Sequence, residues 1–368
     1  MHFRTSSHLK NDFSILCSIV TALVIIGLLF VYSSSSIYAT QQYGSTHYFL
    51  KRQCIGLLLG LCAFFVLRKL PFDLIYICTP LFFFGSWILT ALTLMPQLSQ
   101  RIHGSSRWLS VAGFSFQPSE LLKIAFVMYM AHFLARHENK SFTLKSAYLP
   151  FLFITGLTGG ILLCQPDFGL ATTLITTAGT LLFIAGFPII HLLVVGGALI
   201  PLIGLLIYTQ PYRVKRILTF LDPWKDPQGA GFQVIQSLIA IGSGSWLGSG
   251  ISHSKQKFFY LPMQHTDFIF SIIAEETGFI GSSIIILLYA LFTYFGMKVA
   301  WQLKNKFALL TTLGFVILTS LQALINVFVA TGLLPTKGIG LPFISYGNSS
   351  LICFLCMIGV IALFVNND

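Results

Sequence analysis

Charged residues are scarce in this sequence. They make up 9% of the 368 residues, whereas soluble domains contain about 25%. Hydrophobic residues make up 55%. This composition excludes a soluble globular enzyme and a disordered tail, because both need more polar surface. A membrane helix takes about 20 apolar residues, so we predict an all-α polytopic membrane protein with about ten transmembrane helices.

A disulfide framework and the common cofactor motifs are also lacking. The seven cysteines are odd in number, and nearly all lie inside apolar runs. Cys353 and Cys356 have redox or zinc spacing, but no histidine or second cysteine pair lies nearby, so we interpret them as apolar helix residues. No nucleotide fingerprint or zinc-type histidine spacing occurs. We therefore assign no certain cofactor and expect no nucleic-acid partner.

The glycine-rich run at residues 242–250 is not a P-loop, because no Gly-Lys-Ser/Thr follows it. We interpret it either as a flexible hinge or as backbone that approaches another segment closely. The sequence alone does not separate these two interpretations.

Ten long apolar stretches are present, and each is expected to be helical because backbone groups in lipid must bond internally. They are about Phe13–Val31, Phe49–Leu67, Leu74–Leu94, Pro118–Ala135, Ala147–Cys164, Gly169–Phe187, Ile189–Tyr208, Phe268–Val299, Phe307–Leu334 and Leu341–Val365. No soluble domain interrupts them. We predict a single membrane domain over residues 1–368, with a long extracytoplasmic loop at about 209–266 between spans seven and eight.

An even number of spans places both termini on the same side of the membrane. The short loops on that side carry ten Lys and Arg residues, and the short loops on the other side carry five. The positive-inside rule therefore predicts cytoplasmic termini in a plasma-membrane protein. Twelve of the 22 cations nevertheless lie at or near the outer side. They are either ordinary loop charges or a surface that attracts an anionic substrate such as a phosphate.

Five of the eleven acids lie inside apolar spans or at their outer edges, where an ionisable group is a functional candidate. They are Glu120, Asp167, Asp267, Glu275 and Glu276. Glu120 lies three residues before Lys123, so the two share a helix face and can pair, for function or for span insertion alone. Asp167 follows a proline and either caps the next helix or takes part in catalysis.

Asp267 stands where the eighth span begins. At 100° per residue, Ser271, Ala274 and Gly278 lie on its helix face, so we expect small and polar residues to line a cavity there. Glu275, about 12 Å deeper by helix rise, is expected to border the same cavity. We predict that Asp267 is a general base, with an N-cap as the alternative. Burial raises its pKa and cations lower it, so the sign stays open.

Seven motifs occur in an order that closely resembles the SEDS family of ten-span bacterial membrane proteins, which includes FtsW and RodA. The resemblance covers about Tyr32 to Val365. The motifs are Arg107-Trp108, Gln117–Glu120 with Lys123, Gln165–Gly169, Asp226–Gly231, His265–Phe268, Glu275-Glu276 and Leu341–Gly347. Three further segments are more similar to the division member FtsW than to RodA: Gln210–Arg213, Asp222–Trp224 and Leu334–Gly338.

The resemblance implies a peptidoglycan glycosyltransferase that polymerises lipid II at the outer face of the membrane during septal cell-wall synthesis. It implies a class B penicillin-binding protein and other divisome membrane proteins as partners. It also implies catalytic roles for Asp267, as the base, and for the Glu120–Lys123 pair. We expect substrate binding at Arg107, Arg213, Arg216, Lys337, His265, Thr266, Glu275 and Ser345. Whether Mg²⁺ or Mn²⁺ assists stays open, although so few acids disfavour a cage of several carboxylates.

Two positions depart from the family pattern. Met263 stands where the family often has Glu, and Asn348 stands where a second glycine usually follows Tyr-Gly. Two other functions remain as alternatives: a lipid II flippase, which predicts charges along a path through the bilayer, and a non-catalytic scaffold for the transpeptidase. Polymerisation predicts charges gathered at the outer face, where most of the selected acids and surplus cations lie.

Overall fold

The computed structural model describes most of the chain as helices. It covers the chain except residues 1, 96–98, 103–104, 112–113, 138–147, 189, 191–192, 195, 198–200, 202–203, 205–207, 210, 230, 258–260 and 263. It describes only the backbone at residues 2–6, 99–102, 105–106, 110–111, 114–115, 211–213 and 217. Met263 therefore lies outside the described residues.

Most of the described helices follow the predicted apolar stretches. In chain order they are α1 (His2–Tyr43), α2 (Tyr48–Leu67), α3 (Phe72–Leu92), α4 (Pro118–Arg136), α5 (Leu149–Cys164), α6 (Phe168–Ile184), α8 (Pro211–Leu221), α9 (Phe232–Ser243), α10 (Ile269–Gln302), α11 (Lys306–Ala330) and α12 (Asn348–Asn367). Six of them, α1, α2, α3, α10, α11 and α12, are long and apolar enough to cross a membrane. The prediction of an all-α polytopic membrane protein is confirmed.

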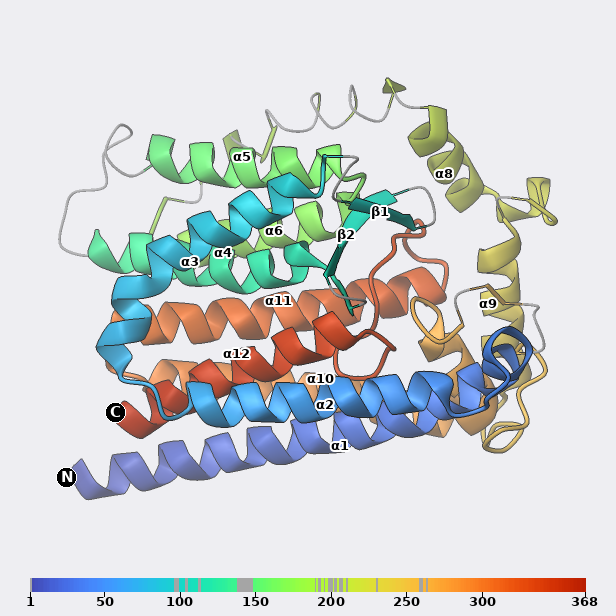
Figure 1. The fold of residues 1–368 in the computed structure, drawn as a ribbon, viewed down its shortest axis with the longest axis horizontal. Helices are drawn as coiled ribbons and strands as arrows, with labels where there is room; N and C mark the ends of the chain where they lie inside the picture. The colour runs from blue at the N-terminus through green and yellow to red at the C-terminus, as the bar shows by residue number, and fades with distance from the viewer. Residues whose placement is uncertain are drawn as a thin grey trace.

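Nine of the ten predicted spans coincide with a described helix. The seventh, at 189–208, lies largely outside the described residues. The first helix is much longer than predicted, because α1 runs for 42 residues rather than ending at Val31. Its last turns, which contain Ser33 to Ser36, project toward the end of the bundle that carries α8 and α9 (Figure 1).

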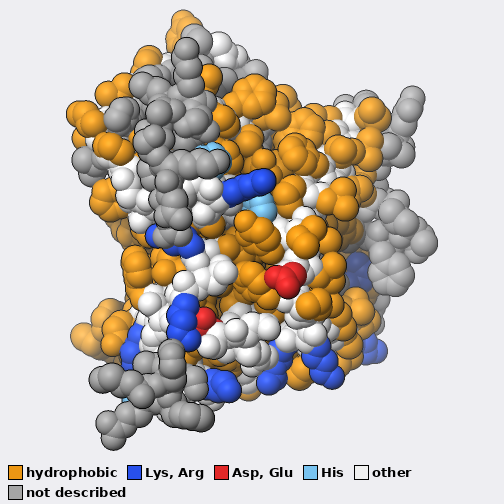
Figure 2. Space-filling view, turned by 90° about the vertical axis from the view of Figure 1, so that its left-hand side faces the viewer, with side chains coloured by type: hydrophobic (Ala, Val, Ile, Leu, Met, Phe, Trp, Pro, Cys, Tyr) orange, Lys and Arg blue, Asp and Glu red, His pale blue; other side chains and the backbone are white. Residues whose placement is uncertain are grey.

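The long helices run side by side, and both termini lie at the same end of the bundle (Figure 1). That arrangement is the one an even number of spans requires. Lys and Arg side chains outnumber acidic ones on this end of the molecule (Figure 2). The described cations in its loops and helix ends are Lys10, Arg68, Lys69, Arg136, Lys298, Lys304 and Lys306.

Glycines let α2 pack closely against α12. Gly56 and Gly60 are four residues apart on α2, and a Cβ added at Gly60 would clash with the Leu355 side chain. Such small-residue pairs are what brings helices together in lipid, where no hydrophobic force acts between them. Asn348, one of the two departures from the family pattern, begins α12 and lies against Gly56. Its Oδ1 would be 3.1 Å from a Cβ added at Gly56. The space beside Gly56 accommodates the extra side chain.

Helix α10 is broken at Gly278, which has a φ of 67° and a ψ of −162°. The glycine-rich run fills the break: the N–H of Ser249 donates to Glu275 O at 2.9 Å, and the N–H of Phe279 donates to Ser245 O at 2.8 Å. A Cβ at Gly248 would overlap the backbone of Glu276. The run is thus a segment of close backbone approach, and it satisfies groups that the break leaves open.

The loops contain structure that the apolar pattern did not predict. Between α3 and α4 lies a three-stranded antiparallel sheet formed by β1 (Ser99–Ile102), β2 (Ser105–Val111) and β3 (Phe114–Phe116). The long loop at 209–266 contains α8, a 3₁₀ turn at Pro223–Lys225 and α9. The sheet and α8 lie at the end of the bundle opposite the termini (Figure 1). These strands and helices are too short to give a long apolar run.

Candidate active site

A cavity of about 1610 Å³ opens between the sheet, the loops and the helix ends opposite the termini. It brings together parts of the chain that are far apart in sequence: the middle of β2, the start of α4, the α5–α6 turn, the segment before α10 and the α11–α12 loop. The predicted site residues that line it are Arg107, Glu120, Asp167, Arg216, His265, Thr266, Asp267, Lys337 and Ser345.

Asp267 is held by its backbone and leaves its carboxylate open. The Asn326 Nδ2 donates to Asp267 O at 2.8 Å and to Ile339 O at 2.8 Å. The next residue, Phe268, is buried in a small apolar cluster with Leu261, which secures the same segment. Among the described residues, none donates a hydrogen bond to the Asp267 carboxylate. Its lone pairs therefore remain available to a substrate.

The structure gives the sign of the Asp267 pKa shift. Burial raises the pKa of Asp267 to about 6, and Asp167 adds to the increase, while Arg107 and Arg216 oppose it. Desolvation therefore outweighs the two cations. A carboxyl with this pKa is mostly ionised at neutral pH and still basic enough to accept a proton, which suits a general base.

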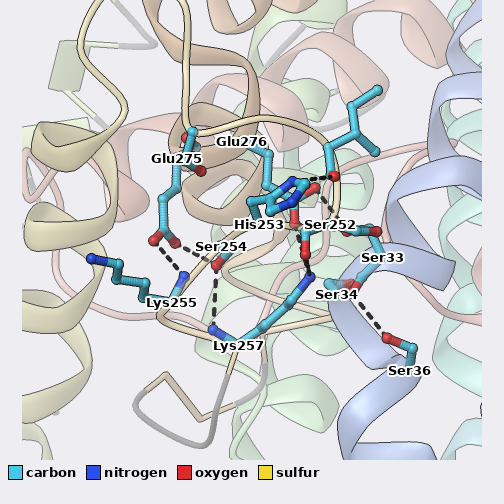
Figure 3. Close-up of polar contacts among 12 residues, drawn as sticks. Ser33, Ser34, Ser36, Ser252, His253, Ser254, Lys255, Lys257, Glu275 and Glu276 are labelled. Atoms are coloured by element: carbon cyan, nitrogen blue, oxygen red, sulfur yellow. Dashed lines mark hydrogen bonds and ion pairs between the residues drawn. The ribbon is translucent and has the colours of Figure 1, made fainter.

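Three expectations about Asp267 and the helix that follows it were wrong. The residue at the N-cap of α10 is Phe268, so Asp267 does not cap the helix. Ser271 bonds the Ser237 hydroxyl at 2.6 Å on α9 instead of lining the cavity. Glu275 lies outside the cavity lining, with its carboxylate bonded to Lys255 N–H at 2.8 Å (Figure 3). The 100° extrapolation failed because Asp267 precedes the first helical turn.

Cations line the same cavity as Asp267. Arg107 lies 3.5 Å from Asp167 and donates from Nε to Gln165 O at 3.1 Å. Arg216 donates to Thr336 O at 2.9 Å. Lys337 lies over the Phe168 ring, 5.5 Å from its centre, and burial lowers the pKa of Lys337. The side chain of Arg213 lies outside the described residues.

Asp167 caps α6, as one of the two open interpretations predicted. Its Oδ1 accepts the N–H of Leu170 at 3.1 Å. The same carboxylate faces Arg107 and lines the cavity. Burial raises the pKa of Asp167, and Arg107 and the Leu170 N–H oppose that effect. Asp167 thus has both a structural contact and a place in the cavity.

The predicted pairing of Glu120 with Lys123 is confirmed. The two side chains meet at 2.6 Å, and their exposed fractions are 14% for Glu120 and 1% for Lys123. Glu120 lines the cavity, whereas Lys123 lies beneath it with Nζ 3.9 Å from the centre of the Phe354 ring. The pair thus presents its carboxylate, and not its ammonium group, to the cavity.

The remaining predicted residues join two cavity loops. The Ser345 Oγ donates to Thr266 O at 2.6 Å and accepts the N–H of Leu341 at 2.7 Å. His265 packs among aromatic rings, 4.5 Å from Phe49 and 5.7 Å from Tyr346 by ring centres. Burial lowers the pKa of His265 to about 4, so the ring is neutral at physiological pH.

Two amides inside apolar helices also hold the cavity loops, although the charge pattern did not predict them. Asn326 on α11 joins the Asp267 segment to the 339–341 segment. Gln53 on α2 donates to Ser345 O at 3.2 Å and accepts the N–H of Gly347 at 3.2 Å. A buried amide in a membrane span must be hydrogen-bonded, so amides in spans were a usable signal. No group of three or more His, Cys, Asp or Glu side chains with metal-ligating geometry occurs among the described residues.

Comparison with known proteins finds relatives along the whole chain. The FtsW/RodA/SpoVE family model, described as cell cycle protein, matches residues 13–367. The chain is 42% identical over 335 residues to the probable peptidoglycan glycosyltransferase FtsW of Geobacter sp. (strain M18), covering 91% of each protein. It is 38% identical over 355 residues to stage V sporulation protein E of Bacillus subtilis (strain 168), covering 96% of each.

Solved structures have the same fold. A protein of a peptidoglycan synthase complex, from work on the structural coordination of polymerization and crosslinking, matches with a TM-score of 0.80 and 32% identity over 96% of this chain and 97% of that one. The rod shape determining protein RodA of Thermus thermophilus matches with a TM-score of 0.71 and 27% identity over 96% of both chains.

Proposed function

The chain belongs to the SEDS family of FtsW, RodA and SpoVE proteins, and we propose that it polymerises lipid II with Asp267 as the catalytic base. One observation carries this proposal. Asp267 is half-buried, has a pKa of about 6 and lines a large cavity beside Arg107 and Arg216. Glycosyl transfer from a lipid pyrophosphate needs one base and several cations, and this cavity holds both.

In the proposed reaction, Asp267 accepts the proton of the acceptor sugar hydroxyl while that hydroxyl oxygen attacks the anomeric carbon of the donor. A carbon–oxygen bond forms there, and the bond from that carbon to the pyrophosphate breaks. The lipid pyrophosphate leaves with the electron pair. Arg107, Arg216 and Lys337 stabilise the developing negative charge. Arg213, on α8 beside Arg216, belongs to the same proposal.

Glu120 and Lys123 form the second part of the proposed machinery. The Lys123 ammonium group pairs with the Glu120 carboxylate, which lines the cavity wall. A carboxylate at this position can accept hydrogen bonds from sugar hydroxyls. His265, Thr266 and Ser345 shape the wall near Asp267 through their loop contacts. Glu275 does not line this wall, because its carboxylate accepts the Lys255 N–H and the Ser254 hydroxyl outside the cavity.

The distribution of charge favours polymerisation over transport. The ionisable residues of the cavity gather at one end of the bundle, opposite the termini. The deeper acids, Glu275 and Glu276, are bonded to loop and helix groups and do not mark a path through the helices. We propose that the termini are cytoplasmic, that the cavity faces outward, and that the protein works at the septum with a class B penicillin-binding protein and other divisome proteins.

The test is a reconstitution with labelled lipid II and the class B partner in liposomes. The proposal predicts long glycan chains from the wild type, resolved by size, and none from Asp267→Asn. Labelled lipid that crosses the bilayer without forming polymer would support a flippase. Equal polymer from wild type and Asp267→Asn would point to a scaffold whose partner does the chemistry.

A further inference from the structure

A second polar cluster lies beside the start of α10, outside the cavity (Figure 3). At its centre, Lys257 Nζ lies 3.4 Å from Glu276 Oε1, and the exposed fractions of the two side chains are 4% and 0%. An ion pair buried this completely is stable only when hydrogen bonds satisfy its remaining atoms. The surroundings of the pair supply those bonds.

Glu276 is bonded from a different helix. The Ser33 hydroxyl on α1 lies 2.7 Å from both Glu276 carboxylate oxygens and 3.4 Å from the Ser252 hydroxyl. Lys257 Nζ also donates to Ser252 O. The cluster therefore joins α1, α10 and the loop before Asp267, as the converging side chains in Figure 3 show.

Glu275 adds a parallel contact beside the ion pair. It accepts the Lys255 N–H at 2.8 Å and the Ser254 hydroxyl, and the Lys257 N–H donates to Ser254 Oγ at 3.3 Å. Residues 254–257 are thus fastened to the first turns of α10 through two successive carboxylates. The side chain of Lys255, in contrast, is exposed.

Along the chain, Asp267 lies between the two members of the ion pair. Lys257 lies ten residues before Asp267, and Glu276 lies nine residues after it. The ion pair therefore closes a loop of the chain, and Asp267 lies near the middle of that loop. Closing a loop at its base removes conformational freedom from the residues within it. Catalysis depends on such placement, because a shift of about 1 Å can lower a rate about 100-fold.

We propose that the Lys257–Glu276 pair positions Asp267 for glycosyl transfer by closing the base of the segment 257–276. Neither residue lines the cavity, so both are positioning residues rather than catalytic ones. The inference rests on the proposed role of Asp267. This role also explains the presence of a buried ion pair at a place where an apolar pair would be at least as stable. The charges and their hydrogen bonds select one conformation of the segment 257–276.

The experiment compares Lys257→Met with Lys255→Met, a matched variant that removes the same charge from an exposed side chain two residues away. In the lipid II polymerisation assay, we expect Lys257→Met to lower kcat at least about 10-fold with little change in KM. Lys257→Arg keeps the charge and should recover most of that loss. Lys255→Met should match the wild type. Amide hydrogen exchange of residues 264–268 should be faster in Lys257→Met alone.

Two results would overturn the inference. One is wild-type kcat in Lys257→Met; the other is unchanged exchange of residues 264–268 relative to Lys255→Met. If Lys257→Met does not fold, Glu276→Asp, which keeps the charge and shortens the side chain, takes its place with the same expectations. If the wild type makes no glycan, the proposed function fails, and the exchange measurement alone still decides whether the pair orders the Asp267 segment.

Discussion

Two carboxylates lie near the start of α10, the half-buried Asp267 and the fully buried Glu276, and they differ in how their oxygens are bonded. Glu276 accepts hydrogen bonds from Ser33 and Lys257. Asp267, nine residues earlier, accepts none from the described part of the chain and meets Arg107 and Arg216 only through longer-range attraction. A carboxylate with bonded oxygens stabilises the fold, whereas one with open lone pairs and a raised pKa is free to take a proton.

The largest expected effect is on the bonded group. Glu276→Gln leaves the Lys257 ammonium group buried without a charge partner, and breaking such a pair costs about 3–5 kcal/mol of unfolding free energy. Denaturation of the purified protein in detergent measures this loss. The double variant Glu276→Gln/Lys257→Met removes both charges and should recover much of the stability. A Glu276→Gln variant as stable as the wild type would contradict the stabilising role of the bonded carboxylate.

Removing the charge of Asp267, whose carboxylate oxygens are not bonded, should raise the unfolding free energy instead of lowering it. The Asp267 pKa rises from 3.8 to about 6 on folding, so the carboxyl stabilises the fold when protonated, and that stability is lost as pH rises through about 6. Asp267→Asn removes the charge and should raise the unfolding free energy at pH 7 by roughly 3 kcal/mol. The gain should vanish below about pH 4. A loss of stability at pH 7 would contradict the assignment.

Asp167 combines features of both groups, because it caps α6 and also faces the cavity. Asp167→Ala removes the acceptor for the Leu170 N–H, and loss of an N-cap costs about 1 kcal/mol. Asp167→Asn keeps a cap acceptor and should retain most of that stability in a thermal denaturation series. Equal losses in the two variants would assign the effect to the Arg107 contact and not to the cap.

The smallest expected effect is a shift in a pH profile. Arg107 lowers the pKa of Asp267, so Arg107→Gln should move the midpoint of the polymerisation rate upward by roughly half a unit. Lys257→Met, which acts through position, should leave that midpoint near its wild-type value. A downward shift in Arg107→Gln would show that Arg107 does not act on the Asp267 charge.

Composition predicted the fold well because lipid leaves the backbone few choices. Apolar stretches such as Phe49–Leu67 became helices at nearly their predicted bounds, since any other backbone would leave groups unbonded in the membrane. The pairing of Glu120 with Lys123 and the cap at Asp167 followed from local spacing. Short elements in loops, such as the β1–β3 sheet, carry no comparable signal.

The contacts of Glu275 and Glu276 could not be predicted in this way. Their partners include Ser33 on another helix and Lys257 in a distant loop, and no local period reports such contacts. Extrapolation from Asp267 also assumed an unbroken helix, while α10 begins at Ile269 and breaks at Gly278. The family resemblance identified the Glu275–Glu276 motif, but only the fold separates it from the cavity.

The central claim is that Asp267 is the base, and its most direct test is the pH dependence of polymerisation by wild type and Asp267→Asn. The wild-type rate should rise with pH and reach half of its plateau near pH 6, the pKa of Asp267. Asp267→Asn should be at least about 100-fold slower and lose that pH dependence. A variant with the wild-type rate and the same rise near pH 6 would contradict the account.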